Sequence, residues 1–413
     1  MHVRIGQLRG AAAALGVAVL AGACSSSNSN SPATTGSTGG SSGAVSSGGA
    51  AATGSPIQIM TISPSGTASV NFPDIPTVLN AYARSVNGKG GIAGHPLKVD
   101  YCNDKNDPNA AAACARKAVS DRDIAVVGSF TTFGDSVTPI LAAANVPDIA
   151  TNAVSATEYT SPISYPLVPG PIGFAALGAK AGSECTTTDV VTIDIPATAA
   201  LAPFIAQGLA SAKKTVAKTV KVPPTATDYS SIVSATKGAD CVVSALPGAL
   251  LNVYLAKATS LGVKQKFFAP AGGVGSDSLK QFGAQLEGSY TISSFPVASD
   301  PAWADLKSAL DAVSQSSVDL VNPENLNAWV AGIVFGKVAS KLTTFDASSL
   351  KAALDMTSAL DTGGLTPPLD FAKPFPLAPL ARLFDTSLVG IDIKGGQLSQ
   401  EGTFTDFGAA LRK

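Results

Sequence analysis

Polar residues follow three predicted strands of this chain at the points where the strands end. Short apolar runs predict these strands, and they are Ile57–Ile62, Ile124–Val127 and Pro147–Ala150. The segments after them, which we call the three polar loops, are Ser63–Thr67, Ser129–Gly134 and Thr151–Ala153. Because the carboxyl ends of parallel strands share one edge of a sheet, we expect the three polar loops to lie together and to face a ligand.

The side chains in these loops are hydrogen-bonding groups suited to a small polar ligand. Hydroxyl groups come from Ser63, Ser129, Thr131, Thr132 and Thr151, and an amide comes from Asn152. Backbone N–H groups near Ala153, at the start of a helix, can hold a carboxylate. A single Ser or Thr is more often a helix cap than a ligand contact. The convergence of three such loops favours a binding site for the set.

Catalytic and metal chemistry find little support in the sequence. Outside the N-terminal segment, His95 is the only histidine, and it stands in the turn Gly94-His95-Pro96 without a candidate partner nearby. A Ser-His-Asp or Cys-His site needs a histidine base. Outside the Ser- and Gly-rich residues 25–55 the chain has no GxSxG motif, and it has no P-loop, Rossmann glycine fingerprint or CxxC motif. We therefore expect no enzyme activity, no metal and no cofactor.

The elements that lead into the second polar loop have clear local signals. A helix stops at Asn87–Gly91, where glycine supplies a positive φ. Alternating Leu97, Val99 and Tyr101 predict a strand, and Asp107 with Pro108 predicts the capped start of the next helix. The apolar run Ile124–Val127 is typical of a parallel strand that is buried on both faces.

This stretch resembles the first lobe of the leucine/isoleucine/valine-type periplasmic binding proteins, the solute receptors of ABC importers. The resembling residues are Asn80-Ala81, Asn87–Gly94, Asp104, Asp107-Pro108 and Val126–Gly128. The resemblance extends from about Ile57 onward. It implies an α/β fold of two doubly wound parallel-sheet lobes joined by a three-strand hinge, and it places the Ser63 turn against the ligand.

The alternation of strands and helices allows the two lobes to be delimited. We expect a first lobe of residues 56–170 and 297–361, and a second lobe of residues 171–296 and 362–413. The predicted crossings lie at Gly170-Pro171, after Pro296, and near Asp361–Gly364. Closure of the lobes around a ligand is the expected motion.

The second lobe departs from the amino-acid-binding members of that family at its predicted ligand wall. Leu246 and Ala271 stand where those members tend to carry an aromatic residue and a carboxylate. An ammonium group buried there would lack a counter-charge, which is costly. We therefore expect the ligand to be a small amino-acid-like solute, a carboxylate or an amide. A carboxylate or amide without an ammonium group should bind more tightly than leucine or valine. A sensor of the same fold, which signals rather than delivers, is the alternative.

The N-terminal segment predicts export and lipidation. Arg4 and Arg9 precede the apolar run Ala11–Leu20, which is too short to span a bilayer. Ala21–Cys24 resembles a bacterial lipobox, with Cys24 acylated; an ordinary secretory signal or a short anchor helix is the alternative. Residues 25–55 are rich in Ser and Gly and predict a disordered tether. We expect a cell-membrane lipoprotein on the extracytoplasmic face.

The remaining four cysteines form an even set in an oxidising compartment, and three pairings are possible. The pairs Cys102–Cys114 and Cys185–Cys241 each stay within one predicted lobe, and we expect these two disulfides.

Composition limits the possible partners. Charged residues make up 14% of the chain and the net charge is −1, so no basic surface for nucleic acid is implied. After the signal segment, no run of 18 apolar residues follows. The expected partners are a small-molecule solute, the permease subunits of an ABC importer, and the membrane through the lipid on Cys24. We expect a monomer.

Overall fold

The computed structural model describes residues 52–409 except residue 69 and residues 196–197 and 199–200. The predicted signal segment, Cys24 and nearly all of the predicted tether lie outside the described residues. Two sheets with their helices make up the described part of the chain. No described helix has the length and apolar character required to cross a membrane.

The first sheet has five parallel strands in the order β2-β1-β3-β4-β5. The strands are β1 (Ile57–Ile62), β2 (Leu97–Cys102), β3 (Val126–Val127), β4 (Asp148–Ile149) and β5 (Ser164–Tyr165). Alternate residues of β1 enter different core clusters, Ile57 and Ile59 on one face and Met60 and Ile62 on the other. This sheet is therefore buried on both faces, as the continuous apolar runs predict.

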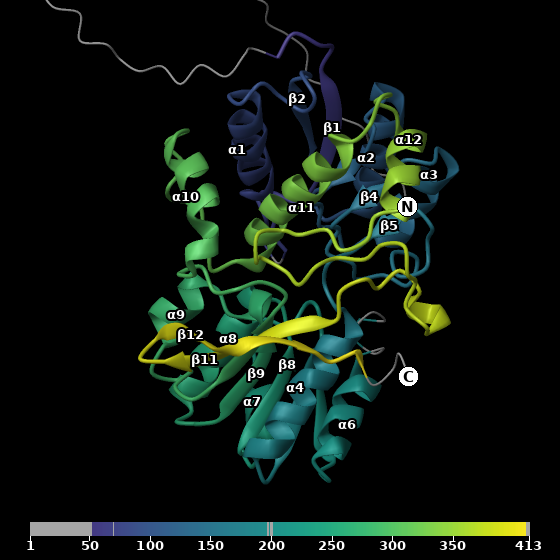
Figure 1. The fold of residues 1–413 in the computed structure, drawn as a ribbon. Helices are drawn as coiled ribbons and strands as arrows, with labels where there is room; N and C mark the ends of the chain where they lie inside the picture. Colours follow the sequence, from purple (N-terminus) through teal and green to yellow (C-terminus); the bar gives the residue numbers. More distant parts are fainter. Residues whose placement is uncertain (1–51, 69, 196–197, 199–200, 410–413) are drawn as a thin grey trace, which may run out of the picture. The chain divides into compact units, whose positions relative to one another are not determined.

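Helices cover both faces of the first sheet. They are α1 (Ile75–Asn87), α2 (Pro108–Asp121), α3 (Gly134–Ala143), η2 (Pro301–Trp303), α10 (Ala304–Asp311), α11 (Pro323–Ala339) and α12 (Ala347–Asp355). The cores of α1, α10, α11 and α12 join the cluster that contains Ile59, whereas α2 and α3 join the cluster that contains Met60. Figure 1 shows α11 beside α1 on this sheet.

The predicted start of α2 is confirmed in detail. The Asp107 carboxylate accepts hydrogen bonds from the backbone N–H groups of Asn109 and Ala110, both at 2.9 Å, and Pro108 is the first helical residue. The helix ends at Arg122, whose φ of 62° is left-handed. This sharp end returns the chain at once to the sheet, where the backbone N–H of Ile124 donates to Gln58.

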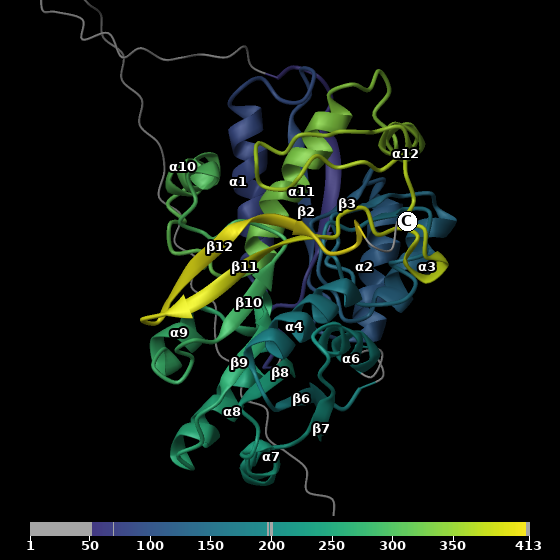
Figure 2. The same cartoon turned by 60° about the horizontal axis from the view of Figure 1, so that its bottom comes forward.

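The second sheet has seven strands in the order β12-β11-β10-β9-β8-β6-β7. The strands are β6 (Thr188–Ile193), β7 (Val216–Val222), β8 (Cys241–Ala245), β9 (Lys266–Pro270), β10 (Tyr290–Ser293), β11 (Ser387–Lys394) and β12 (Gln397–Asp406). The first five are parallel, as predicted. The hairpin of β11 and β12 is an antiparallel addition at the edge beside β10, and Figure 2 shows it in yellow.

Helices also cover the second sheet. They are α4 (Pro171–Glu184), α6 (Ala202–Ser211), α7 (Ser230–Thr236), α8 (Gly248–Ser260), η1 (Ala271–Gly273) and α9 (Ser276–Phe282). Two glycines allow α4 and α6 to pack closely. A Cβ on Gly178 would lie 2.3 Å from the carbonyl oxygen of Ile205. A Cβ on Gly208 would lie 2.0 Å from the carbonyl oxygen of Ala175.

The chain returns to the second sheet later than predicted. Leu365, Leu369 and Phe371 belong to the core cluster of the first sheet, and Phe384 is buried in the same cluster. The expected crossing at Asp361–Gly364 is a local turn instead, in which Gly363 and Gly364 have positive φ and Leu360 bridges back to Leu369. The glycine pair signalled a turn, but the turn keeps the chain on the first sheet as far as η3 (Ala378–Leu380). There Leu380 packs with Ala153 of the third polar loop and also with Ile172 of α4, so η3 lies where the chain meets both sheets.

The two expected disulfides are present. Cys102 at the end of β2 bonds to Cys114 in α2, and Cys185 after α4 bonds to Cys241 at the start of β8. Each bond ties a strand to a helix or helix end of its own sheet, so neither crosses between the two sheets.

We predict that Gly332→Ala destabilises the protein. A Cβ on Gly332 in α11 would lie 2.6 Å from the ring of Tyr82 in α1, which is itself buried and packed edge-on against Trp329. Overpacking costs about 1–3 kcal/mol, and better helix propensity offsets at most about 1 kcal/mol of that. Thermal unfolding should show a lower midpoint for Gly332→Ala. Gly238→Ala is the control, because a Cβ there meets nothing within 4 Å; equal midpoints for both variants would contradict this account of the packing.

Candidate functional site

The three polar loops meet at the carboxyl ends of β1, β3 and β4. The Ser129 hydroxyl accepts a hydrogen bond from the Ile62 backbone N–H at 2.9 Å, and the Phe130 N–H donates to the Ile62 carbonyl at 3.0 Å. The Asn152 N–H donates to the Ser129 carbonyl at 3.0 Å. Ser129, in the second polar loop, thus binds both the end of β1 and the third polar loop, and it does so from a buried position.

Most of the predicted hydroxyl groups bind neighbouring parts of the same sheet. Ser63 donates to the Phe72 carbonyl at 3.2 Å, Thr131 to the Asp104 carboxylate at 2.6 Å, and Thr151 to the Glu158 carboxylate at 3.2 Å. All three residues are buried. Thr132 is exposed, and its hydroxyl binds Asn106 at 2.6 Å. The hydrogen bonds of these four hydroxyl groups fix the conformation of the polar loops.

The segment after Ala153 is a turn and not the expected helix start, and its amides already hold a carboxylate from within the chain. The backbone N–H groups of Val154 and Ser155 donate to the Glu158 carboxylate at 3.0 and 2.8 Å. The Ala153 carbonyl accepts a hydrogen bond from the Tyr159 hydroxyl. The sequence analysis expected a ligand carboxylate at these amides, but in the structure the Glu158 side chain occupies them.

Asn152 differs from the other polar residues because its side chain reaches a distant helix. Its amide nitrogen lies 2.6 Å from both carboxylate oxygens of Glu324, which stands in the first turn of α11. Asn152 is half-buried and Glu324 is buried. One turn further along α11, the Asn327 amide donates to the Ala150 carbonyl at 2.6 Å. The start of α11 is therefore bound to the third polar loop.

The Glu324 carboxyl also lies close to the second sheet. A Cβ on Gly272 in η1 would stand 3.6 Å from its Oε1 atom. Burial raises the pKa of Glu324 to about 7, although the hydrogen bond from Asn152 acts in the opposite direction. At neutral pH this carboxyl group can either donate or accept a proton, depending on what lies beside it.

The two second-lobe positions chosen from the sequence have different surroundings. Leu246 is buried in the core cluster of the second sheet with Val274 and Phe267. Ala271 begins η1 and is half-buried, and Gly272 after it is exposed. The accessible wall is therefore the Ala271–Gly273 turn, and Leu246 supports it from beneath through packing.

Sequence reasoning missed Glu324. Asn322, Pro323 and Glu324 form a recognisable helix start, and the Asn322 side chain indeed accepts from the Glu324 N–H at 3.0 Å. An acidic residue in the first turn of a helix is expected for its dipole alone. Only the packing of α11 onto the strand ends, where Gly128 lies against Ala328, brings this carboxyl group to the polar loops.

Comparison with known families decides the classification. A family model described as periplasmic binding protein matches residues 57–374, well over half of the chain. The chain belongs to the periplasmic binding proteins. The resemblance inferred from the sequence is thereby confirmed, and the two-sheet α/β architecture is that of the type I members. No curated protein matches the chain.

Solved structures with the same fold share little sequence with this periplasmic binding protein. An extracellular ligand-binding receptor from Verminephrobacter eiseniae superposes with a TM-score of 0.70 at 18% identity, covering 83% of this chain and 99% of its own. An ABC transporter solute binding protein from R. palustris, in complex with benzoate, gives 0.67 at 15% identity, covering 84% and 96%. A putative branched-chain amino acid ABC transporter from Rhodospirillum rubrum gives 0.60 at 17% identity, covering 84% and 99%.

We predict that Glu324→Gln is stabilising at high pH. Burial raises the pKa of this carboxyl group in the folded protein. Between the ordinary glutamate pKa and the raised one, the folded protein keeps the proton, whereas the unfolded chain loses it. Its contribution to stability therefore falls as pH rises from about 4.5 to about 7 and is constant above.

Chemical denaturation at several pH values measures this effect. Relative to wild type, Glu324→Gln should gain about 2–3 kcal/mol between about pH 5 and about pH 8. The exposed Glu287→Gln variant is the control and should gain nothing. A pH-independent difference between Glu324→Gln and wild type would refute the raised pKa.

Proposed function

We propose that this chain is the extracytoplasmic substrate-binding lipoprotein of an ABC importer, that it captures a small carboxylate or amide solute, and that it is not an enzyme. Membership of the periplasmic binding proteins supports a binding role. Two structures with the same fold are solute binding proteins of ABC transporters in complex with benzoate and with 4-hydroxybenzoate. Both of those ligands carry a carboxylate and lack an ammonium group.

The Asn152–Glu324 pair is the observation that carries the proposal. Asn152 belongs to the third polar loop and the Glu324 carboxyl lies beside Gly272, so a ligand that meets the pair would touch both sheets. Few accessible polar groups are left in the loops, because Ser63, Thr131 and Thr151 bind their own neighbours. The ligand's polar end should therefore meet the Asn152 amide and the Glu324 carboxyl.

The protonation state of Glu324 selects the class of ligand. A neutral carboxyl donates a hydrogen bond to a ligand carboxylate or carbonyl oxygen, whereas an ionised one repels a carboxylate and pairs with an ammonium group. No lysine or arginine forms an ion pair with Glu324 among the described residues. Burial without a cationic partner therefore favours the neutral acid, which suits a ligand without an ammonium group.

Calorimetry at two pH values tests the ligand class. We expect benzoate or 4-methylpentanoate to bind more tightly than leucine, which is the amino analogue of the second acid. Because binding requires neutral Glu324, the affinity for the acid should fall about tenfold between about pH 6 and about pH 8. For Glu324→Gln, which always offers a donor, the affinity should be independent of pH over this range. Glu287→Gln is the control and should behave like wild type.

Two other results would contradict the proposed ligand class. Leucine that binds with micromolar affinity and more tightly as pH rises would identify ionised Glu324 as the partner of an ammonium group. The protein would then be an amino acid receptor. Binding of neither class would leave the family role intact but would overturn the proposed ligand.

The lipid anchor has a separate test. We predict that Cys24→Ser moves the protein from the membrane fraction to the soluble extracytoplasmic fraction, because the thiol that would carry the lipid is gone. Fractionation followed by immunodetection measures this change. Cys102→Ser is a control that also replaces one cysteine, and it should stay with the membrane. Unchanged membrane association of Cys24→Ser would rule out lipidation at this residue.

A further inference from the structure

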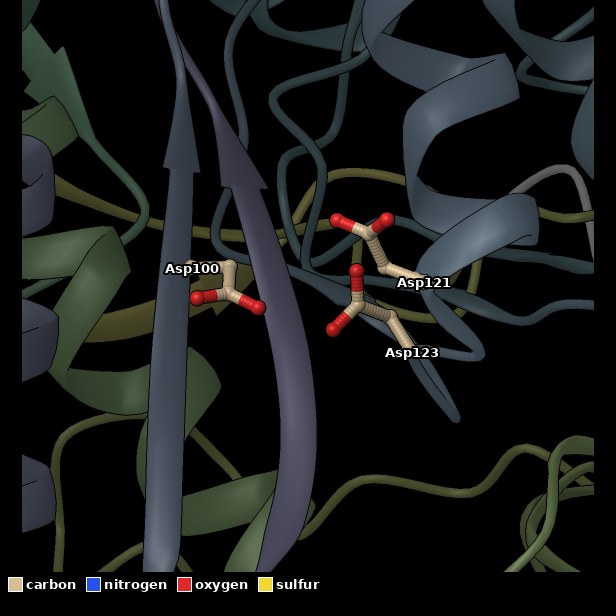
Figure 3. A group of neighbouring side chains, drawn as sticks. All are labelled: Asp100, Asp121 and Asp123. Carbon is tan, nitrogen blue, oxygen red and sulfur yellow. The ribbon is translucent and has the colours of Figure 1, made fainter.

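Three carboxylates meet on the first sheet away from the polar loops. Asp100 comes from β2, Asp121 from the last residue of α2, and Asp123 from the segment between α2 and β3. One oxygen from each of the three lies within 4.8 Å of the others. Figure 3 shows the Asp121 and Asp123 side chains together, with Asp100 across from them on its strand.

The backbone brings these three residues to one face. Asp100 is the register partner of Met60, whose side chain packs in the core cluster beneath α2, so Asp100 faces α2 as well. The left-handed Arg122 separates Asp121 from Asp123, and the Asp123 N–H donates to the Ala118 carbonyl at 3.0 Å. Strand β2 and the C-terminal end of α2 therefore fix the positions of all three aspartates.

The surroundings of Asp123 are the second observation that points to a bound cation. Its side chain is only 2% exposed, and neither of its carboxylate oxygens has a hydrogen-bond partner. Lys98 pairs with Asp100 at 3.0 Å and Lys117 pairs with Asp121, but neither lysine binds Asp123. A buried carboxylate without a partner is costly, and a bound cation removes that cost.

We propose that Asp100, Asp121 and Asp123 bind a divalent cation, with Ca²⁺ as the preferred ion. The donors are all carboxylate oxygens, which suit hard cations and do not favour zinc or copper. Asp121 is partly exposed and gives the ion access from solvent, and water molecules complete its coordination. The ion would tie the edge strand β2 to the connection between α2 and β3, stabilising the first sheet.

Equilibrium dialysis with ⁴⁵Ca²⁺ and thermal unfolding test the site in the full-length protein kept in detergent. We expect one bound Ca²⁺ per chain and a higher midpoint in Ca²⁺ than in EDTA. The dissociation constant should be about 1 mM or below, as in extracellular calcium modules. In Asp123→Asn, the affinity should fall about tenfold or more, because the ligand charge is reduced.

Asp392→Asn is the matched control. Asp392 pairs with Lys394 two residues along strand β11, just as Asp100 pairs with Lys98 on β2. This variant should keep the full response to Ca²⁺. If Asp123→Asn does not fold, Asp100→Asn on the edge strand serves in its place. Absence of saturable binding by Ca²⁺, Mg²⁺ and Mn²⁺ up to about 10 mM, or an undiminished response in Asp123→Asn, would overturn the proposal.

Discussion

The buried carboxyl group of Glu324 is the constraint on which the arrangement of the site depends. A carboxyl group removed from water must be protonated or hydrogen-bonded, and Asn152 meets part of that need at 2.6 Å. The two residues are 172 positions apart in the sequence, so this contact fixes the start of α11 against the third polar loop. The same carboxyl lies against the Gly272 turn of the second sheet. A change in the charge of Glu324 therefore alters the electrostatic environment of segments that belong to both sheets.

The polar loops around this pair are held by hydrogen bonds within the first sheet. Asp104 binds Thr131, and Glu158 binds Thr151 together with two backbone amides. These contacts fix the loops before any ligand arrives, and a preorganised site loses less conformational freedom on binding. They also explain why a loop rich in hydroxyl groups offers few of them to a ligand.

Local signals in the sequence were sufficient for much of the fold. The apolar run of β1, the alternating residues of β2, the Asp107 cap and the glycine stop after Asn87 depend on neighbouring residues, and the structure has each of them. Both disulfides follow from the even cysteine count and the order of the elements. The α/β class and the family were therefore accessible from sequence alone.

Features that depend on distant contacts were not accessible in the same way. The turn at Asp361–Gly364 has the same glycines whether the chain crosses or stays, and only the burial of Leu369 and Phe371 decides. Ser129 has the same hydroxyl whether it meets a ligand or the Ile62 N–H. Glu324 is an ordinary helix-start residue until α11 is placed on the strand ends. Such long-range pairing is what local patterns do not encode.

The state of the Glu324 carboxyl can be measured directly by carbon-13 NMR of protein labelled at the glutamate side-chain carboxyl carbon. The resonance missing from Glu324→Gln assigns the group. The account predicts a titration midpoint near pH 7 in the free protein, moving to higher pH when a carboxylate ligand binds. A midpoint at the ordinary pKa of a glutamate, unmoved by any ligand, would contradict the central role given to Glu324.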